Sequence, residues 1–289
     1  MARLEVEKVP YEDYTNRQLL LVPLVVLAVA LLIILGAYLL TGSPVTLGLD
    51  FTGGTEMRLA AADMSGGEIE TAFEDAGIEI ASVRSVGAGD SYLLTTQETD
   101  TQALEAVTDQ IEVDVESIEA RSAAFGSDTQ QEALFGVVLA FVGMSVLVGL
   151  MFRTLVPSIA VVASAFSDIV IPIALMNVFS IELTLGAVAA LLMIIGYSVD
   201  SDILLNNHIL RRRGSFYESA YRAMRTGVSM TLTSIAAMVT MFLVAWYLGI
   251  PLLDDIALIL VFGLTADLMN TYLLNMSLLR WYKFEGVSQ

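Results

Sequence analysis

Long apolar runs alternate with short polar breaks along this chain, and the pattern predicts membrane-spanning helices. The first run covers residues 19–40, and five more occupy 133–152, 155–178, 183–205, 228–248 and 256–279. A helix of about 20 apolar residues crosses the roughly 30 Å hydrocarbon core of a bilayer. We therefore expect six transmembrane helices.

Residues 42–131 follow a different pattern, with alternating and amphipathic stretches in place of continuous apolar runs. Period-two stretches predict strands at 45–59, 78–86, 92–96 and 113–121, and amphipathic stretches predict helices at 67–76 and 101–111. The order βαββαβ is that of a ferredoxin-like fold, and its polar strands exclude burial in lipid.

The predicted fold class is an α-helical polytopic membrane protein with one external α+β ferredoxin-like domain between the first and second of six transmembrane helices. A cytoplasmic tail (1–18) and the first helix (19–41) precede the external domain (42–131). A five-helix bundle (132–279) follows, with an arginine-rich cytoplasmic loop (206–227), and a cytoplasmic tail (280–289) ends the chain.

Composition supports this class, since 56% of the residues are hydrophobic, 16% are charged and the mean hydropathy is +0.71. The chain has no cysteine and one histidine. Disulfides and thiolate chemistry are thereby excluded, a histidine-built metal site is disfavoured, and we expect no metal and no cofactor.

Charge is distributed unevenly. The net charge is −18, and residues 42–131 hold 18 acids against three arginines. This excess argues against a nucleic-acid partner. It fits a high-salt milieu, because screening over about 3 Å at 1 M salt removes the self-repulsion of the external domain.

Lysine and arginine set the expected orientation. They gather in both tails, at Arg153 and in the loop 206–227, whereas the loops after the third and fifth predicted spans hold none. Both termini are therefore expected in the cytoplasm and residues 42–131 outside the cell. Arg211, Arg212 and Arg213 would anchor the chain at the cytoplasmic interface.

The motif GLDFTGGT begins at Gly48 and includes Asp50, Phe51, Gly53 and Gly54. Tandem glycines after a β-prone segment allow positive φ or a close backbone approach. No GKS or GKT follows, which argues against a phosphate-binding loop. We expect a tight turn where the first span meets the external domain.

Acidic residues inside apolar runs are costly and are functional candidates by default. Asp168 lies mid-span, four residues before Pro172, which frees the carbonyl of residue 168. Asp267 lies in the last run. A satisfied structural hydrogen bond is the alternative for Asp168.

The fourth run carries Gly196, Asp200 and Asn207 on one helical face, and Asp202 about 200° around the helix from Asp200. Because Asp202 is nearer the arginines, we expect Asp202 to reach the interface and Asp200 to be the buried acid. In the fifth run, Ser229 and Thr233 either bond to their own helix or line a polar track.

These features together resemble the SecF family of protein-export membrane components, within the resistance-nodulation-division superfamily. The resemblance rests on GLDFTGGT after a first span, one external domain, five clustered spans, an arginine-rich loop and GYSVDSDILL, which contains Gly196 and Tyr197. Asp200 matches the acid of the GYSVD pattern, and Asp168 matches the acid of a pair in the third span.

Four positions depart from bacterial members of that family: Ser167 replaces a histidine, Ser201 replaces an acid, the region of Ser229 lacks an arginine, and Asp267 replaces a small residue. With the acidic external domain, these departures indicate an archaeal, halophilic type.

The resemblance implies a subunit that is not an enzyme and that acts with SecD beside the SecY channel, coupling proton flow to the outward movement of preproteins. The implied partners are SecD, SecY, preprotein clients and membrane lipids. A proton-driven exporter subunit for lipids or small molecules and a non-conducting scaffold for SecD are alternatives. The ion-pathway candidates are Asp168, Asp200, Asp267, Asp202, Ser229 and Thr233.

Overall fold

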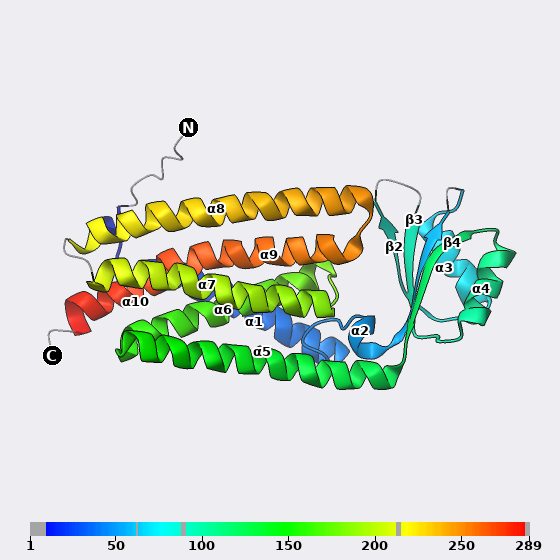
Figure 1. Cartoon of the computed structure of the whole chain (residues 1–289), viewed down its shortest axis with the longest axis horizontal. Helices are drawn as coiled ribbons and strands as arrows, with labels where there is room; N and C mark the ends of the chain where they lie inside the picture. The colour runs from blue at the N-terminus through cyan, green and yellow to red at the C-terminus, as the bar shows by residue number, and fades with distance from the viewer. Residues whose placement is uncertain (1–9, 62, 88–90, 212–214, 287–289) are drawn as a thin grey trace.

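The computed structural model describes residues 10–61, 63–87, 91–211 and 215–286. A bundle of long helices forms most of the molecule, and a small α+β unit lies at one end of the bundle (Figure 1). The chain enters the bundle, leaves it to build this unit, and returns through a long helix.

Five helices among the described residues are long and apolar enough to cross a membrane. They are α1 (Asn16–Thr41), α5 (Ala123–Phe152), α6 (Leu155–Phe179), α7 (Leu185–Arg211) and α8 (Phe216–Leu248). Each overlaps a predicted apolar run. However, α5 begins ten residues before its run, within the predicted external domain, and α8 begins twelve residues before its run, within the predicted loop 206–227.

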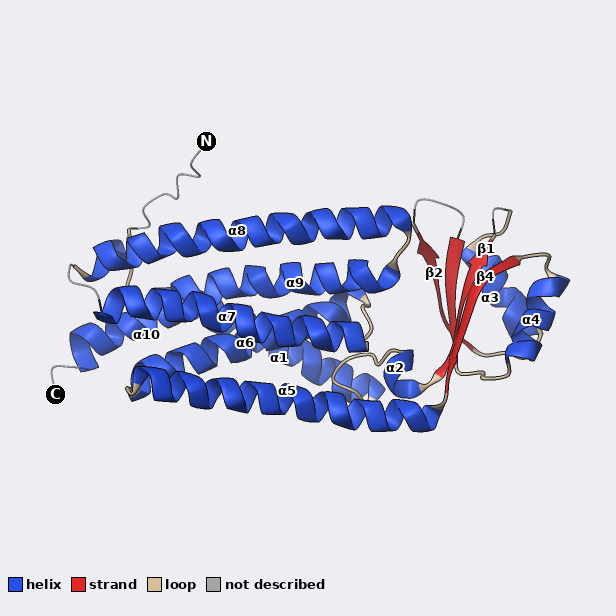
Figure 2. Ribbon diagram, viewed as in Figure 1, coloured by secondary structure: helices blue, strands red, loops and turns tan. Residues whose placement is uncertain are grey.

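The run predicted at 256–279 falls on a sixth helical column. It comprises α9 (Pro251–Met269), the π-helix η2 (Asn270–Asn275) and α10 (Met276–Trp281), followed by η3 (Tyr282–Gly286). A short helix η1 (Tyr11–Asp13) precedes α1. The column lies beside α7 and α8 (Figure 2). Three acids, Asp254, Asp255 and Asp267, lie within the 19 residues of α9, which is therefore not among the five helices named above.

The centre of the bundle is formed by α6, α7 and α9. Met176, Ile194 and Ile259 on these three helices are at most 1% exposed and belong to one apolar cluster. By contrast, only 6% of the apolar stretch of α5 and 11% of that of α8 is buried. The outer helices therefore present most of their apolar surface to their surroundings.

The α+β domain, which we define as Gly54–Arg121, contains one antiparallel sheet. Its elements are β1 (Gly54–Ala60), α3 (Gly66–Asp75), β2 (Ile80–Val86), β3 (Ser91–Thr96), α4 (Thr101–Gln110) and β4 (Asp114–Arg121), and the sheet order is β2-β3-β1-β4. Both helices cover the face turned away from the bundle (Figure 2). The domain has its own core, which includes Met57, Phe73 and Leu94.

The predicted strands and helices of this domain agree with the structure to within a few residues, with one exception. The stretch 45–59 is not continuously extended, because Leu49–Thr52 forms the helical turn α2. Gly53 ends this turn with a positive φ of 73°, which favours glycine. A local turn with its own backbone hydrogen bonds thus interrupts a segment that β propensity alone would extend.

Candidate functional site

Asp168 lies at the centre of α6 and is completely buried. Ser198 of α7 donates a hydrogen bond to its Oδ2 at 2.6 Å, and Asn270 of η2 donates one to its Oδ1 at 2.6 Å. Asp168 therefore connects three helical columns through neutral donors.

Asp202 on α7 is also completely buried. Its Oδ1 accepts hydrogen bonds from Asn275 Nδ2 at 2.7 Å and from Thr271 Oγ1 at 2.9 Å, whereas its Oδ2 has no partner. The unpaired Oδ2 can therefore gain or lose a proton without breaking a hydrogen bond.

Asp267 on α9 is 1% exposed and completes the cluster. Its Oδ1 lies 2.6 Å from Ser201 Oγ and 3.2 Å from Thr271 Oγ1, and its Oδ2 has no partner. Thr271 has one hydroxyl proton and contacts both Asp202 and Asp267, so it can donate to only one of them at a time.

No cation compensates these three acids within the described part of the chain. The ion pairs found there involve Arg58, Arg121 and Arg222, none of which contacts the cluster. No group of three or more acidic, histidine or cysteine side chains among the described residues could hold a metal ion. Buried carboxylates without a cation are costly in a membrane, and their chemistry is suited to proton exchange.

The π-helix η2 explains how two asparagines reach two different acids. In an α-helix, residues five apart point about 140° away from each other. The wider π turn of η2 brings Asn270 and Asn275 to the same side, where they donate to Asp168 and Asp202. Single π turns inside α-helices occur frequently at functional sites.

The prediction that Asp200 is the buried acid and Asp202 the interfacial one is wrong about burial. Asp202 and Ser198, four residues apart, share the face of α7 that packs on α6 and η2. Asp200 is exposed and lines a cavity of about 370 Å³ with Tyr197 and Asn207. The angle between the two acids was predicted correctly, but helix packing decides which face is inside.

Gly196 lies on the same open side of α7, and a side chain added there would meet nothing within 4 Å. The predicted face of Gly196, Asp200 and Asn207 therefore exists, but none of its members reaches the buried cluster.

Ser229 and Thr233 are not brought to the cluster either. Ser229 donates to the carbonyl of Arg225 at 2.8 Å and Thr233 to that of Met230 at 2.7 Å, so both satisfy their own helix α8. Of the predicted cytoplasmic anchor, Arg211 is the last residue of α7, and Arg212 and Arg213 lie outside the described residues.

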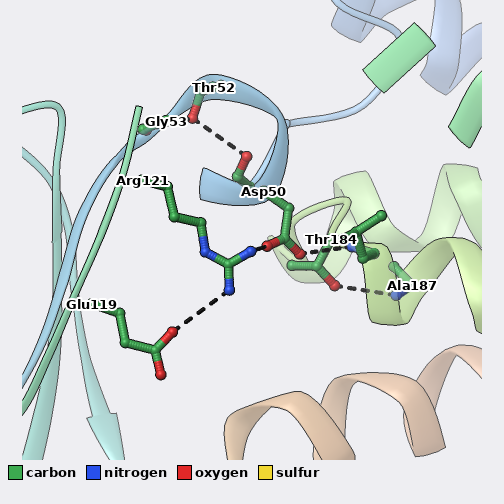
Figure 3. A network of polar contacts seen from close by, with 9 residues as sticks. Asp50, Thr52, Gly53, Glu119, Arg121, Thr184 and Ala187 are labelled. Atoms are coloured by element: carbon green, nitrogen blue, oxygen red, sulfur yellow. Dashed lines mark hydrogen bonds and ion pairs between the residues drawn. The ribbon is translucent and has the colours of Figure 1, made fainter. Parts of the chain in front are cut away.

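The GLDFTGGT motif forms the predicted tight turn. Gly53 and Gly54 have φ of 73° and 116°, and a side chain on Gly54 would lie 2.3 Å from the carbonyl oxygen of Thr96. Asp50 forms an ion pair with Arg121 and accepts a hydrogen bond from the backbone N–H of Leu185 at 2.8 Å (Figure 3). The motif thus joins the α+β domain to the first residue of α7.

Five residues of the cluster were not predicted as site members: Ser198, Ser201, Asn270, Thr271 and Asn275. Polar residues in an apolar run could have indicated a buried polar site. That Asn270 and Asn275 point to the same side could not be predicted, because an α-helical period places them on different faces.

The fold and the cluster together define a multi-pass membrane protein with acidic groups buried between its helices and an α+β domain inserted after its first helix. Residues 100–285 match the family described as protein export membrane protein SecD/SecF, C-terminal, and residues 38–62 match the SecD/SecF GG motif. The chain belongs to the SecF family of protein-export membrane proteins.

Curated proteins described as protein-export membrane protein SecF match all or nearly all of this chain. The protein-export membrane protein SecF of Haloferax volcanii is 61% identical, with all of both chains covered. That of Pyrococcus furiosus is 38% identical over 93% of each chain. A further relative at 59% identity comes from Haloquadratum walsbyi, in agreement with the halophilic type expected from the acidic composition.

A solved structure shares the fold. SecDF from Thermus thermophilus, described as a translocon-associated membrane protein, superposes with a TM-score of 0.73 at 21% identity. The match covers 98% of this chain and 40% of SecDF, so the chain spans less than half of that larger protein.

Proposed function

We propose that this SecF subunit couples an ion gradient, in the first instance protons, to preprotein export through the cluster of Asp168, Asp202 and Asp267. The observation that carries the proposal is three buried carboxyl groups that form no ion pair with any described residue, two of which have an unpaired oxygen. The hydroxyl of Thr271 lies between those two and can change its acceptor as the protonation state changes.

SecD is the proposed partner inside the membrane. Asp200 lies on an exposed face of α7, and α5 and α8 leave most of their apolar stretches uncovered. An exposed acid inside a membrane requires protein or water around it. The larger SecDF protein, of which this chain matches 40%, supports a second subunit that covers these faces.

The proposed topology has six spans, with α9, η2 and α10 forming the sixth. Arginine and lysine counts support cytoplasmic termini and an extracellular location for residues 42–131. The βαββαβ order and the antiparallel sheet order β2-β3-β1-β4 support a ferredoxin-like class for the α+β domain. No step in this mechanism makes or breaks a covalent bond of a client, so we propose a subunit that is not an enzyme.

Affinity purification from native membranes tests the proposed partners. A tagged chain should recover SecD and the SecY channel, together with preproteins in transit and bound lipid. Recovery of a second exporter half without either Sec component would instead favour a proton-driven exporter of lipids or small molecules.

The scaffold alternative, in which the chain only stabilises SecD, makes a different prediction. It requires that replacing the buried acids by asparagine leaves export unchanged as long as SecD still assembles. Measurements of export and SecD recovery on the same variants separate the two functions.

A further inference from the structure

The contact between the α+β domain and the bundle is the strongest feature that the buried cluster does not explain. All three arginines of residues 42–131, Arg58, Arg84 and Arg121, line one cavity of about 300 Å³ between the sheet and the end of the bundle. The other face of the sheet carries the helices α3 and α4 (Figure 2). In a segment with 18 acids, every positive side chain is thus placed at this joint.

Arg121 and Asp50 form the first attachment of this joint. Arg121, the last residue of β4, forms an ion pair with Asp50, and its second terminal nitrogen lies 3.5 Å from Glu119 Oε2 (Figure 3). The other carboxylate oxygen of Asp50 accepts the N–H of Leu185, which begins α7. A carboxylate at this position accepts a hydrogen bond from an otherwise unpaired N–H, and its negative charge interacts favourably with the positive end of the helix dipole.

The backbone around Asp50 strengthens this attachment. Gly48 N–H donates to Leu183 carbonyl at 2.8 Å, and Leu183 N–H donates to Thr46 carbonyl at 2.7 Å. On the opposite side, a side chain at Gly126 of α5 would lie 2.7 Å from the carbonyl group of Phe51. The turn α2 is therefore held between the start of α5 and the start of α7.

Arg58 forms the second attachment, on another helix. Its Nη1 donates to the carbonyl of Gly249 at 2.5 Å, where α8 ends, and its Nε lies 2.6 Å from Glu116. A cation at a helix C-terminus is favourable. Two arginines thus attach the domain to the ends of two different helices.

Arg84 lies between these attachments. It lines the cavity with Glu56, Glu182 and Asp255, and no direct ion pair joins it to them in the described residues. Burial raises the pKa of Glu182, and the charge of Arg84 opposes this increase. Its positive charge therefore offsets part of the cost of placing domain and bundle carboxylates in one cavity.

We propose that Asp50 is a positioning residue that fixes the orientation of the α+β domain to the start of α7, the helix that carries Asp202. The domain and the buried cluster are then connected through one helix, and a movement of α7 changes the orientation of the domain. This inference rests on the proposed coupling function, and it assigns a mechanical role to the acid of the GG motif.

The test measures domain orientation directly. The chain has no cysteine, so Ala106→Cys on α4 and Leu40→Cys at the end of α1 introduce two spin labels for distance measurements in the SecD-containing complex. Loss of a charge-assisted hydrogen bond shifts an equilibrium by roughly tenfold or more. We therefore expect Asp50→Asn to raise the ratio of displaced to native distances by about tenfold and to reduce reporter export.

Three further variants make the result specific. Arg121→Gln removes the ion pair but keeps the Asp50 contact with α7, and it should displace the domain, whereas Arg121→Lys should restore most of the native distance. Asp109→Asn removes an exposed acid from α4 of the same domain and should change neither distance nor export.

An unchanged distance distribution in both Asp50→Asn and Arg121→Gln would overturn the proposal, and so would a displaced domain with normal export. If Asp50→Asn does not assemble, Arg121→Gln and Arg121→Lys decide the question by themselves. Failure of the proposed function is seen separately, as normal export from variants of the buried acids.

Discussion

Thr271 links two acids of the buried cluster through its single hydroxyl group. Its oxygen lies 2.9 Å from Asp202 and 3.2 Å from Asp267, and it has a single proton to donate. When one acid is neutral, the hydroxyl is free to serve the other. A change in the protonation of Asp202 on α7 can therefore change the hydrogen bonding of Asp267 on α9 through Thr271, without a change in backbone conformation.

Thr271→Val keeps the shape of this side chain and removes its hydrogen bonds, so we expect reduced export and a loss of about 1–3 kcal/mol of stability. Thr271→Ser keeps the hydroxyl and should retain most of the export. Reporter export and thermal unfolding of the purified complex measure the two effects. Equal export from the valine and serine variants would exclude a role for the hydroxyl.

The acids show how far single residues could be predicted. The depth of Asp168 and Asp267 followed from apolar neighbours in the sequence, and both are buried in the structure. The choice between Asp200 and Asp202 did not follow, because helical periodicity gives the angle between two side chains but not the direction of the core. That direction is set by Ser198, Asn275 and the packing of α6.

The GG turn is the element at which backbone geometry limits the sequence most strictly. Gly54 combines a φ of 116° with a contact of 2.3 Å between an added side chain and Thr96 carbonyl oxygen. By comparison, Gly67 in α3 has no atom within 4 Å of an added side chain.

Gly54→Ala should therefore destabilise the α+β domain by about 2 kcal/mol, the range for a strained backbone combined with a steric clash. Gly67→Ala should be neutral or stabilising, because alanine favours a helix over glycine by about 1 kcal/mol. Chemical denaturation of the two variants provides the comparison. A Gly54→Ala protein as stable as Gly67→Ala would show that the turn tolerates a side chain.

Most elements were predictable because their patterns are local. Apolar length identified the helices that became α1, α5, α6, α7 and α8, and period-two alternation identified the strands of the domain. The tight turn at the tandem glycines was predictable, but the helical form of α2 and the π-helix η2 were not. Both depend on contacts with distant segments, α7 for the turn and the buried acids for η2.

At the scale of the whole molecule, the dominant feature is the charge of the α+β domain and its flanks. The domain itself, residues 54–121, holds 16 acids against three arginines, and their self-repulsion should destabilise it at low ionic strength. We expect its melting temperature to rise between about 0.1 M and about 3 M KCl, as the Debye length falls from about 10 Å to 3 Å or less.

The domain has its own core of Met57, Phe73 and Leu94, so the segment of residues 54–121 is suitable for this measurement. A melting temperature that stays flat or falls with salt would contradict a stabilising role for screening.

The central claim is that the buried acids take part in export by exchanging protons. The direct measurement is reporter export from cells whose only copy of the chain carries Asp168→Asn and Asp202→Asn, with SecD recovery measured on the same membranes. Asparagine keeps the size of the side chain but cannot titrate. Asp200→Asn is the matched control, since it removes a charge from the exposed face of α7.

We predict that the double variant recovers SecD normally and loses export, whereas Asp200→Asn retains more export than the double variant. Normal export from the double variant with normal SecD recovery would contradict the account.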